Sequence, residues 1–236
     1  MRPDFDILKA RRALALCRDS YALAGDVIGI HTDTHVLIRE TAQDIAIAVR
    51  GSVSVENWLQ DFDIRPEPQV VGWVHYGFNR DASEVLQNVA QRVKASGKPV
   101  FAAGHSKGAA DVARLCELMA LMGIPISDLY TFGEPRWCNA AHAAVYPLAD
   151  IHWRLVNGAD IVPRVPPWLD GYRHVGRQAY LPPLSTHVEY SPSFWAMALA
   201  DAIGIYMDWS LEKKCALTEE HHLPSYEAAL NRLEWK

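Results

Sequence analysis

The stretch VFAAGHSKGAADVARLCELM, residues 100–119, decides the fold. A short apolar run at Lys98–Ala103 predicts a strand, and helical periodicity follows over Lys107–Met122. Between them, GHSKG at residues 104–108 fits the pattern G-x-S-x-G. A serine on a tight strand-to-helix turn stands above the sheet, and flanking glycines let the backbone turn without a Cβ clash. The context favours a raised nucleophile over a Gly-rich turn whose serine only caps the helix.

Strands and helices alternate on both sides of this unit. Strands are predicted at His35–Glu40, Asp44–Arg50, Asp128–Phe132, Ile151–Val156 and Tyr172–Leu181. Helices are predicted at about residues 6–24, 81–95 (with Asp81 as N-cap), 139–146, 193–208 and 225–233. This order indicates an α/β fold with a mostly parallel central sheet flanked by helices. Because no repeat or Pro/Gly/Ser-rich linker divides the chain, we expect a single domain over residues 1–236.

Composition narrows the class of protein. Half of the 236 residues are hydrophobic and 22% are charged, which is typical of a packed globular protein. The net charge is −5 without a block of like charges, so no nucleic-acid partner is expected. The most apolar stretch, Phe194–Met207, contains Asp201 and is shorter than the ~18–20 residues of a membrane span. We therefore expect no transmembrane segment.

Two further features bear on location and metal binding. The opening MRPDFDILKARR lacks an apolar core, so no signal peptide is predicted and a cytoplasmic location is the default expectation. Four scattered cysteines lack CxxC or zinc spacing, so no metal site is predicted; they fit free thiols at least as well as two disulfide bridges: Cys17, Cys116, Cys138 and Cys215.

Five motifs occur in an order that resembles a known family. They are AVRGSVSVENWLQDF (48–62), VHYGF (74–78), GHSKG (104–108), YTFGEPRWCN (130–139) and NGADIVPRVP (157–166). Over residues 44–230 the chain resembles the class 3 lipases, which implies the α/β-hydrolase fold. The chain departs from the family where Lys107 replaces the commonest leucine, where Ala109 replaces a frequent glycine, and where Cys138 replaces a glycine.

A serine nucleophile needs a histidine base and a carboxylate that orients the histidine. In α/β hydrolases the chain order is Ser, then Asp or Glu, then His. Ser106 is the predicted nucleophile, and Asp160 is the predicted carboxylate because it follows the strand at 151–156 and matches the family's aspartate. Asp150 and Asp170 are alternatives that lack both the strand and the motif.

Composition does not select the base among the histidines that follow Asp160. His174 lies in a predicted strand and is interpreted as structural, whereas His187 lies in a loop and stays open. The ending EEHHLPSYEAAL (219–230) resembles the family's C-terminal segment, and its spacing to a tyrosine favours His221 over His222.

Acyl transfer also needs donors aimed at the oxyanion. The N–H of Lys107, directly after the nucleophile, is expected to supply one. The resemblance implies that Ser52 supplies the second; alternatively, Ser52 caps the next helix. The resemblance also places Asn57, Trp58 and Leu59 in a lid over the site, although a fixed amphipathic surface helix fits the same residues.

These expectations describe a serine carboxylic-ester hydrolase that needs no cofactor or metal. The resemblance implies an ester or lipid substrate, such as an acylglycerol, at a lipid–water interface. A phospholipase A1, a feruloyl-type esterase and a catalytically silent lipase-like interaction protein are the alternatives. The sequence makes no prediction of oligomeric state.

Overall fold

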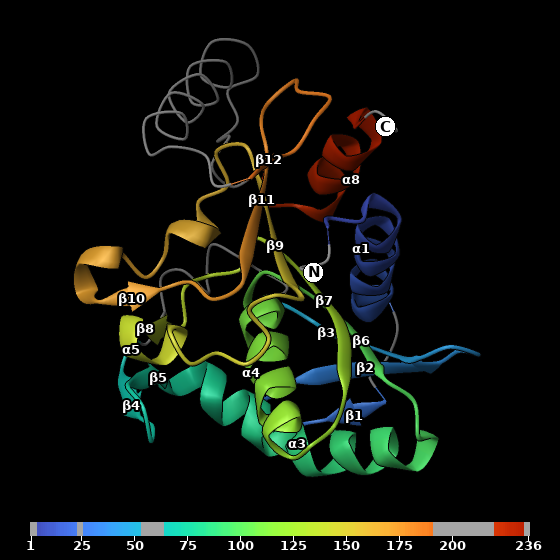
Figure 1. Ribbon diagram of the computed structural model, residues 1–236, viewed down its shortest axis with the longest axis vertical. Coiled ribbons are helices and arrows are strands. Elements are labelled where there is room, and N and C mark those ends of the chain that lie inside the picture. Colours follow the sequence, from blue (N-terminus) through green and yellow to red (C-terminus); the bar gives the residue numbers. More distant parts are fainter. Residues whose placement is uncertain (1–3, 23–25, 53–63, 191–219, 234–236) are drawn as a thin grey trace.

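The computed structural model describes residues 4–22, 26–52, 64–190 and 220–233 (Figure 1). Within these ranges eight strands form the main sheet, in the order β1 (Val27–Ile28), β2 (His35–Glu40), β3 (Ile45–Val49), β6 (Val100–His105), β7 (Ile126–Phe132), β9 (His152–Asn157), β11 (Arg177–Leu181) and β12 (Glu189–Tyr190). Strands β3, β6, β7, β9 and β11 run parallel, and antiparallel strands flank them at both edges. The mostly parallel sheet predicted from the sequence is confirmed.

Both faces of the central strands are buried, which explains their continuous apolar sequence. Every residue of β3, IAIAV, is buried, and β6 is buried from Val100 to His105. Alternate residues enter two separate cores: Val100 and Ala102 belong to one, and Phe101 and Ala103 to the other.

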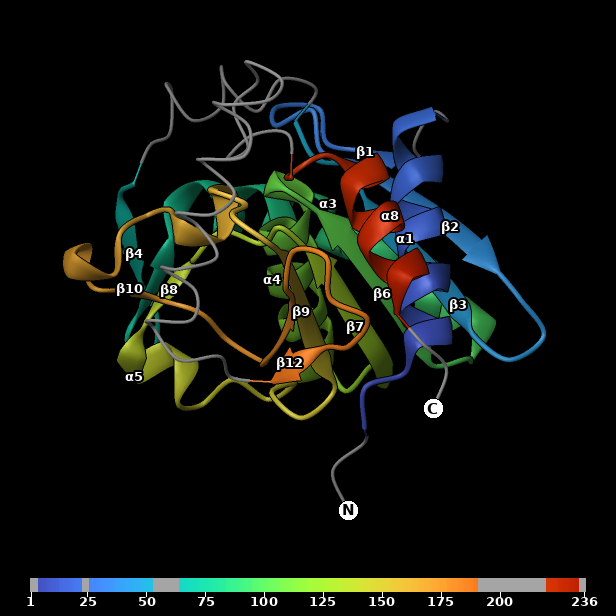
Figure 2. The same cartoon turned by 90° about the horizontal axis from the view of Figure 1, so that it is seen from above.

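Helices cover the two faces of the sheet (Figures 1 and 2). One face packs against α1 (Ile7–Ala22) and α8 (Leu223–Arg232), whose residues share the core of Phe101. The other face packs against α3 (Tyr76–Ser96) and α4 (Lys107–Leu121), whose residues share the core of Val100. The result is a three-layer α/β/α molecule with α4 beginning directly at the end of β6.

A second, smaller sheet lies beside the helices α3 and α5 (Ala140–Ala143). Its order in the described residues is β10 (Tyr172–Arg173), β8 (Cys138–Asn139), β5 (Trp73–His75) and β4 (Pro66–Pro68), all antiparallel. Two short 3₁₀ helices, Val162–Arg164 and Trp168–Asp170, lead to β10. Sequence periodicity does not predict this sheet, because strands of two or three residues have no measurable period.

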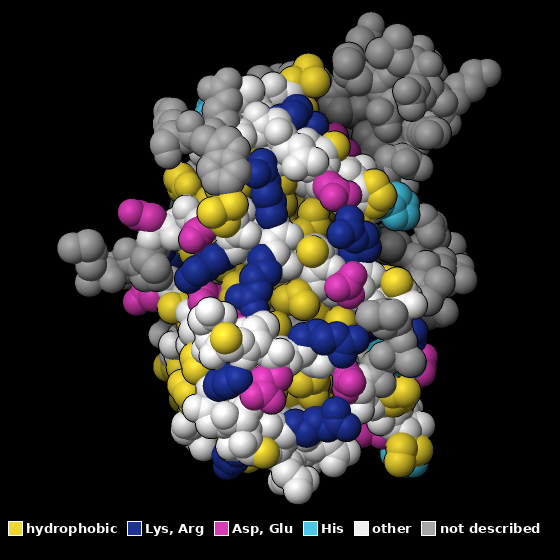
Figure 3. Space-filling model, turned by 90° about the vertical axis from the view of Figure 1, so that its right-hand side faces the viewer, with side chains coloured by type: hydrophobic (Ala, Val, Ile, Leu, Met, Phe, Trp, Pro, Cys, Tyr) yellow, Lys and Arg dark blue, Asp and Glu magenta, His cyan; other side chains and the backbone are white. Residues whose placement is uncertain are grey.

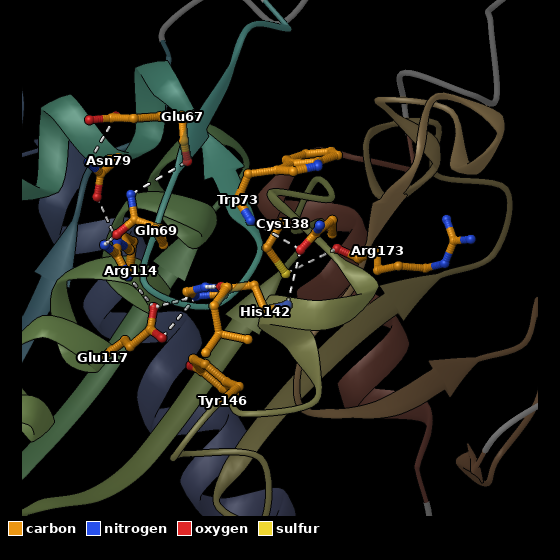
Figure 4. A network of polar contacts seen from close by, with 12 residues as sticks. Glu67, Gln69, Trp73, Asn79, Arg114, Glu117, Cys138, His142, Tyr146 and Arg173 are labelled. Carbon is orange, nitrogen blue, oxygen red and sulfur yellow. Dashed lines mark hydrogen bonds and ion pairs between the residues drawn. The ribbon is translucent and has the colours of Figure 1, made fainter.

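A buried polar network connects the α4 helix to the segments that carry the small sheet (Figure 4). Arg114 donates to Glu117, Asn79 and Gln69 at 2.6–2.8 Å. His142 of α5 contacts the same Glu117 carboxylate at 2.9 Å. Because Arg114 and Glu117 are each 3% exposed, this network holds its charges almost entirely away from water.

Two predicted elements need correction, and a third cannot be compared. The helix predicted from Asp81 begins at Tyr76, its N-cap is His75, and Asp81 is a buried residue within α3. The single segment Tyr172–Leu181 is two strands in different sheets, divided at Gly176, whose φ is +67°. His174 therefore lies in the connection between β10 and β11 and not in a strand. The helix predicted at 193–208 lies outside the described residues, as does the Phe194–Met207 stretch.

The outer face of α1 and α8 carries Lys and Arg side chains interspersed with acidic ones (Figure 3). Lys9 pairs with Asp128, Arg12 pairs with Asp44 and Arg18 pairs with Glu227, at 2.6–3.3 Å. Three basic residues of α1, Lys9, Arg12 and Arg18, are thus paired with carboxylates.

In the described ranges, no helix combines the length and apolarity needed to cross a membrane. Cys17, Cys116 and Cys138 are free and buried, and Cys215 lies outside these ranges.

Candidate active site

Ser106 occupies the sharp turn between β6 and α4. Its φ of 60° and ψ of −134° are unusual for a residue with a side chain, and such backbone strain clusters at functional sites. A Cβ at Gly104 would collide with the backbone of Gly108 and Ala109, and a Cβ at Gly108 would collide with the backbone after β3. The turn therefore needs both glycines, as the G-x-S-x-G pattern predicts.

A buried acid–base pair is provided by Asp160 and His221. The Nδ1 of His221 lies 2.9 Å from Oδ2 of Asp160, and both side chains are completely buried. Asp160 also accepts hydrogen bonds from the N–H of Val162 at 2.9 Å and from the hydroxyl of Tyr226 at 2.7 Å. These donors hold the carboxylate in place, and the carboxylate orients the imidazole.

His105, the last residue of β6 and the neighbour of Ser106 in the chain, contacts this pair. Its ring stacks on His221 with centroids 4.6 Å apart, and its Nε2 donates to the carbonyl of His221 at 2.7 Å. Its Nδ1 lies 2.9 Å from the hydroxyl of Tyr21 on α1. Burial, followed by the influence of His221, lowers the pKa of His105 well below its ordinary value. A neutral His105 that accepts from Tyr21 and donates to His221 satisfies both contacts.

Two reactive atoms in this region lack hydrogen-bond partners among the described residues. Ser106 Oγ and His221 Nε2 are both buried, and neither has a hydrogen-bond partner in the described part of the chain. Before substrate binds, catalytic hydrogen bonds are often long or poorly aligned. Gly133 leaves space for the Asp160–His221 pair: its φ is +59°, and a Cβ there would lie 2.6 Å from the His221 ring.

The loop after β3 lies beside Ser106. A Cβ on Gly51 would lie 3.1 Å from the Cβ of Ser106, so Gly51, the residue before Ser52, adjoins the nucleophile. Ser52 is partly buried. The predicted lid residues Asn57, Trp58 and Leu59 lie outside the described residues.

The alternative residues lie elsewhere. His222 is exposed at the N-cap of α8, and His187 is exposed in a loop where it contacts Ser185. His174 donates through Nε2 to the carbonyl of Pro163 at 2.8 Å. Asp150 and Asp170 are exposed. Only His221 and Asp160, of the described candidates, combine burial with mutual contact.

Sequence reasoning missed the supporting residues Tyr21, His105 and Gly133. His105 is one of the two unspecified positions of the pentapeptide, and Gly133 lies in the motif TFGEPR, so position within motifs was the available signal. Tyr21 carries no such signal, because it is distant in the chain and its role depends on the packing of α1. Over the residues described, no group of three or more His, Cys, Asp or Glu is arranged to hold a metal ion.

The parallel sheet, the strained serine turn and the buried Asp–His pair define an α/β-hydrolase fold with serine-hydrolase geometry. The family model "Lipase (class 3)" matches residues 46–169, more than half of the chain. The chain belongs to the class 3 lipase family.

Individual relatives agree with this assignment. "Secreted mono- and diacylglycerol lipase 1" of Fusarium solani is 34% identical over 175 residues, which cover 70% of this chain and 52% of that protein. "Lipase" of Rhizomucor miehei is 34% identical over 165 residues, which cover 63% of this chain and 45% of that protein. The chain thus spans about half the length of these relatives.

Solved structures match the fold. The Rhizomucor miehei triacylglyceride lipase superimposes with a TM-score of 0.63 at 26% identity, covering 77% of this chain and 80% of that one. A triacylglycerol lipase described as having a serine protease triad at its catalytic centre gives a TM-score of 0.69 at 24% identity, covering 82% and 89%.

The comparisons overturn one expectation. The relatives from Fusarium solani and Penicillium camembertii are named as secreted lipases. The cytoplasmic location expected from the sequence is therefore wrong.

Proposed function

We propose that this protein is a serine carboxylic-ester hydrolase of the lipase type that cleaves acylglycerols. The observation that carries the proposal is the buried Asp160–His221 pair beside a strained Ser106, with Ser106 Oγ and His221 Nε2 both unpartnered among the described residues. A serine, an imidazole and an oriented carboxylate are the groups that acyl transfer requires. The relatives named as mono- and diacylglycerol lipases support acylglycerols as the substrate class and the outside of the cell as the location.

The reaction proceeds in two halves. His221 Nε2 takes the proton of Ser106 Oγ as this oxygen attacks the ester carbonyl, and Asp160 stabilises the imidazolium that results. The tetrahedral intermediate collapses, the C–O bond to the alcohol breaks, and Nε2 returns the proton to the leaving alkoxide. Water then attacks the acyl-enzyme with the same base, releasing the carboxylic acid and free Ser106.

The negative charge of the intermediate needs donors. The backbone N–H of Lys107 is the first, since it follows the nucleophile at the start of α4, where the helix dipole favours negative charge. Ser52 is the second, and its support is the proximity of Gly51 to Ser106 together with the family's RGS motif.

The test uses one substitution and one matched control. Ser106→Ala is expected to abolish hydrolysis of a p-nitrophenyl ester and labelling by a fluorophosphonate, while the thermal midpoint stays within a few degrees. Ser127→Ala, which removes a hydroxyl at the opposite end of the sheet, where it bonds to the Val100 carbonyl, should keep both activities. A Ser106→Ala protein that retains more than a few per cent of wild-type kcat would refute the proposal.

A further inference from the structure

The side chain of Lys107 joins two helices beside the nucleophile. Its ammonium lies 2.8 Å from Oδ2 of Asp111 on α4 and also contacts Oδ2 of Asp81 on α3. The two carboxylates are 1% and 2% exposed, whereas the lysine is 22% exposed. The family's usual leucine at this position could form neither ion pair, so this cluster belongs to the chain's departure from the family pattern.

The two carboxylates stabilise the charged form of Lys107. Burial alone lowers the pKa of Lys107, but the charges of Asp111 and Asp81 outweigh it and raise the pKa above its ordinary value. Arg80 adds a contact to Oδ1 of Asp81 at 3.3 Å. Removing one partner from a buried ion pair is strongly destabilising, so Lys107 is confined to a single position.

The first turn of α4 has no other side-chain anchor among the described residues. Ser106, its N-cap, makes no capping hydrogen bond with its side chain. The next positions, Gly108 and Ala109, have no side chain that could form a hydrogen bond or an ion pair. By contrast, α3 is capped by His75, which accepts from the N–H of Phe78. The Lys107 side chain thus adds an ion pair that ties the residue after the strained serine to α3.

We propose that Lys107 is a positioning residue: its ammonium, held between Asp81 and Asp111, fixes the direction of its own backbone N–H toward the oxyanion. This inference rests on the proposed function, in which that N–H is an oxyanion donor. A misdirected donor weakens the transition state and leaves the ground state almost unchanged, since the interaction strengthens only as charge develops. The alternative is that Lys107 merely neutralises two buried carboxylates.

The experiment separates alignment from neutralisation. Lys107→Met is expected to lower kcat about 10- to 100-fold with little change in KM, measured per active site titrated with a fluorophosphonate. Affinity for a boronic acid that mimics the tetrahedral intermediate should fall by a similar factor. Lys98→Met, which removes a lysine paired with Glu40 at the far end of β6, is the matched control and should keep wild-type kcat.

A triple variant decides the cause. Lys107→Met with Asp81→Asn and Asp111→Asn leaves no uncompensated carboxylate, so its thermal midpoint should rise above that of Lys107→Met while kcat stays low. Recovery of kcat in the triple variant would overturn the proposal, because Lys107 would then be only a counter-ion. A Lys107→Met protein with wild-type kcat would overturn it as well. Absence of hydrolysis and labelling in the wild-type protein would instead refute the proposed function.

Discussion

His221 and His222 are neighbours in the chain but lie in different surroundings. His221 is buried against Asp160, whereas His222 is exposed at the start of α8. His221→Ala should therefore lower kcat by on the order of 10⁴- to 10⁶-fold, because a serine without its base is a poor nucleophile. His222→Ala should keep most of the activity, which makes it the matched control. Steady-state kinetics on a p-nitrophenyl ester would measure both, and the reverse ranking would contradict the assignment.

The contact that singles out His221 could not be derived from the sequence. Asp160 and His221 are 61 positions apart, and their approach depends on how β9 and α8 pack. The chemistry of acyl transfer required a histidine after Asp160, and only the family resemblance selected His221. The serine is different, because its motif and its strand–helix context are local.

At the scale of elements, the apolar pattern predicted the central sheet well. β2 has the predicted bounds, His35–Glu40, and α4 differs from its predicted helix by one residue at its C-terminal end. The prediction for α3 failed at its start, because Asp81 resembles an N-cap. The true cap is an imidazole, His75, and Asp81 is buried to meet Lys107 from another helix. Long-range charge pairing of this kind has no signature in local periodicity.

The network around Glu117 should contribute to stability. Glu117→Gln would leave the buried Arg114 guanidinium without its carboxylate and would weaken the contact to His142. Breaking a buried pair typically costs about 3–5 kcal/mol. Glu227→Gln, at an exposed pair with Arg18, should cost less than about 1 kcal/mol. Urea unfolding of both variants measures these costs. Equal unfolding midpoints for Glu117→Gln and Glu227→Gln would show that the Glu117 network does not stabilise the fold.

The raised pKa of Asp111 predicts how the free energy of unfolding changes with pH. Burial raises the pKa of Asp111 from 3.8 to about 7, although Lys107 opposes the rise. Between these values the folded state binds more protons than the unfolded state, so this group's contribution to stability is lost as pH rises toward 7. Asp111→Asn lacks the titration. The difference in unfolding free energy, variant minus wild type, should therefore increase from pH 4 to pH 7. Parallel stability curves would contradict this expectation.

At the scale of the whole molecule, burial of the site constrains how a substrate reaches it. Ser106 and His221 are both 0% exposed, so an ester cannot contact Oγ or Nε2 unless covering residues move. A related lipase–inhibitor complex, at 27% identity and a TM-score of 0.67, is described as a model for interfacial activation. A lipid surface would activate hydrolysis if it stabilised a conformation in which the residues that cover Ser106 have moved.

We expect interfacial activation. Activity on a sparingly soluble triglyceride should rise abruptly above its solubility limit, because only then does a lipid surface exist. Trp58→Ser should reduce the rise, since the resemblance places Trp58 in the lid, although it lies outside the described residues. Trp168→Ser is the matched control: Trp168 is 57% exposed on a 3₁₀ helix, and its loss should leave the rise unchanged. Smooth saturation through the solubility limit would instead indicate an esterase whose site opens without a lipid surface.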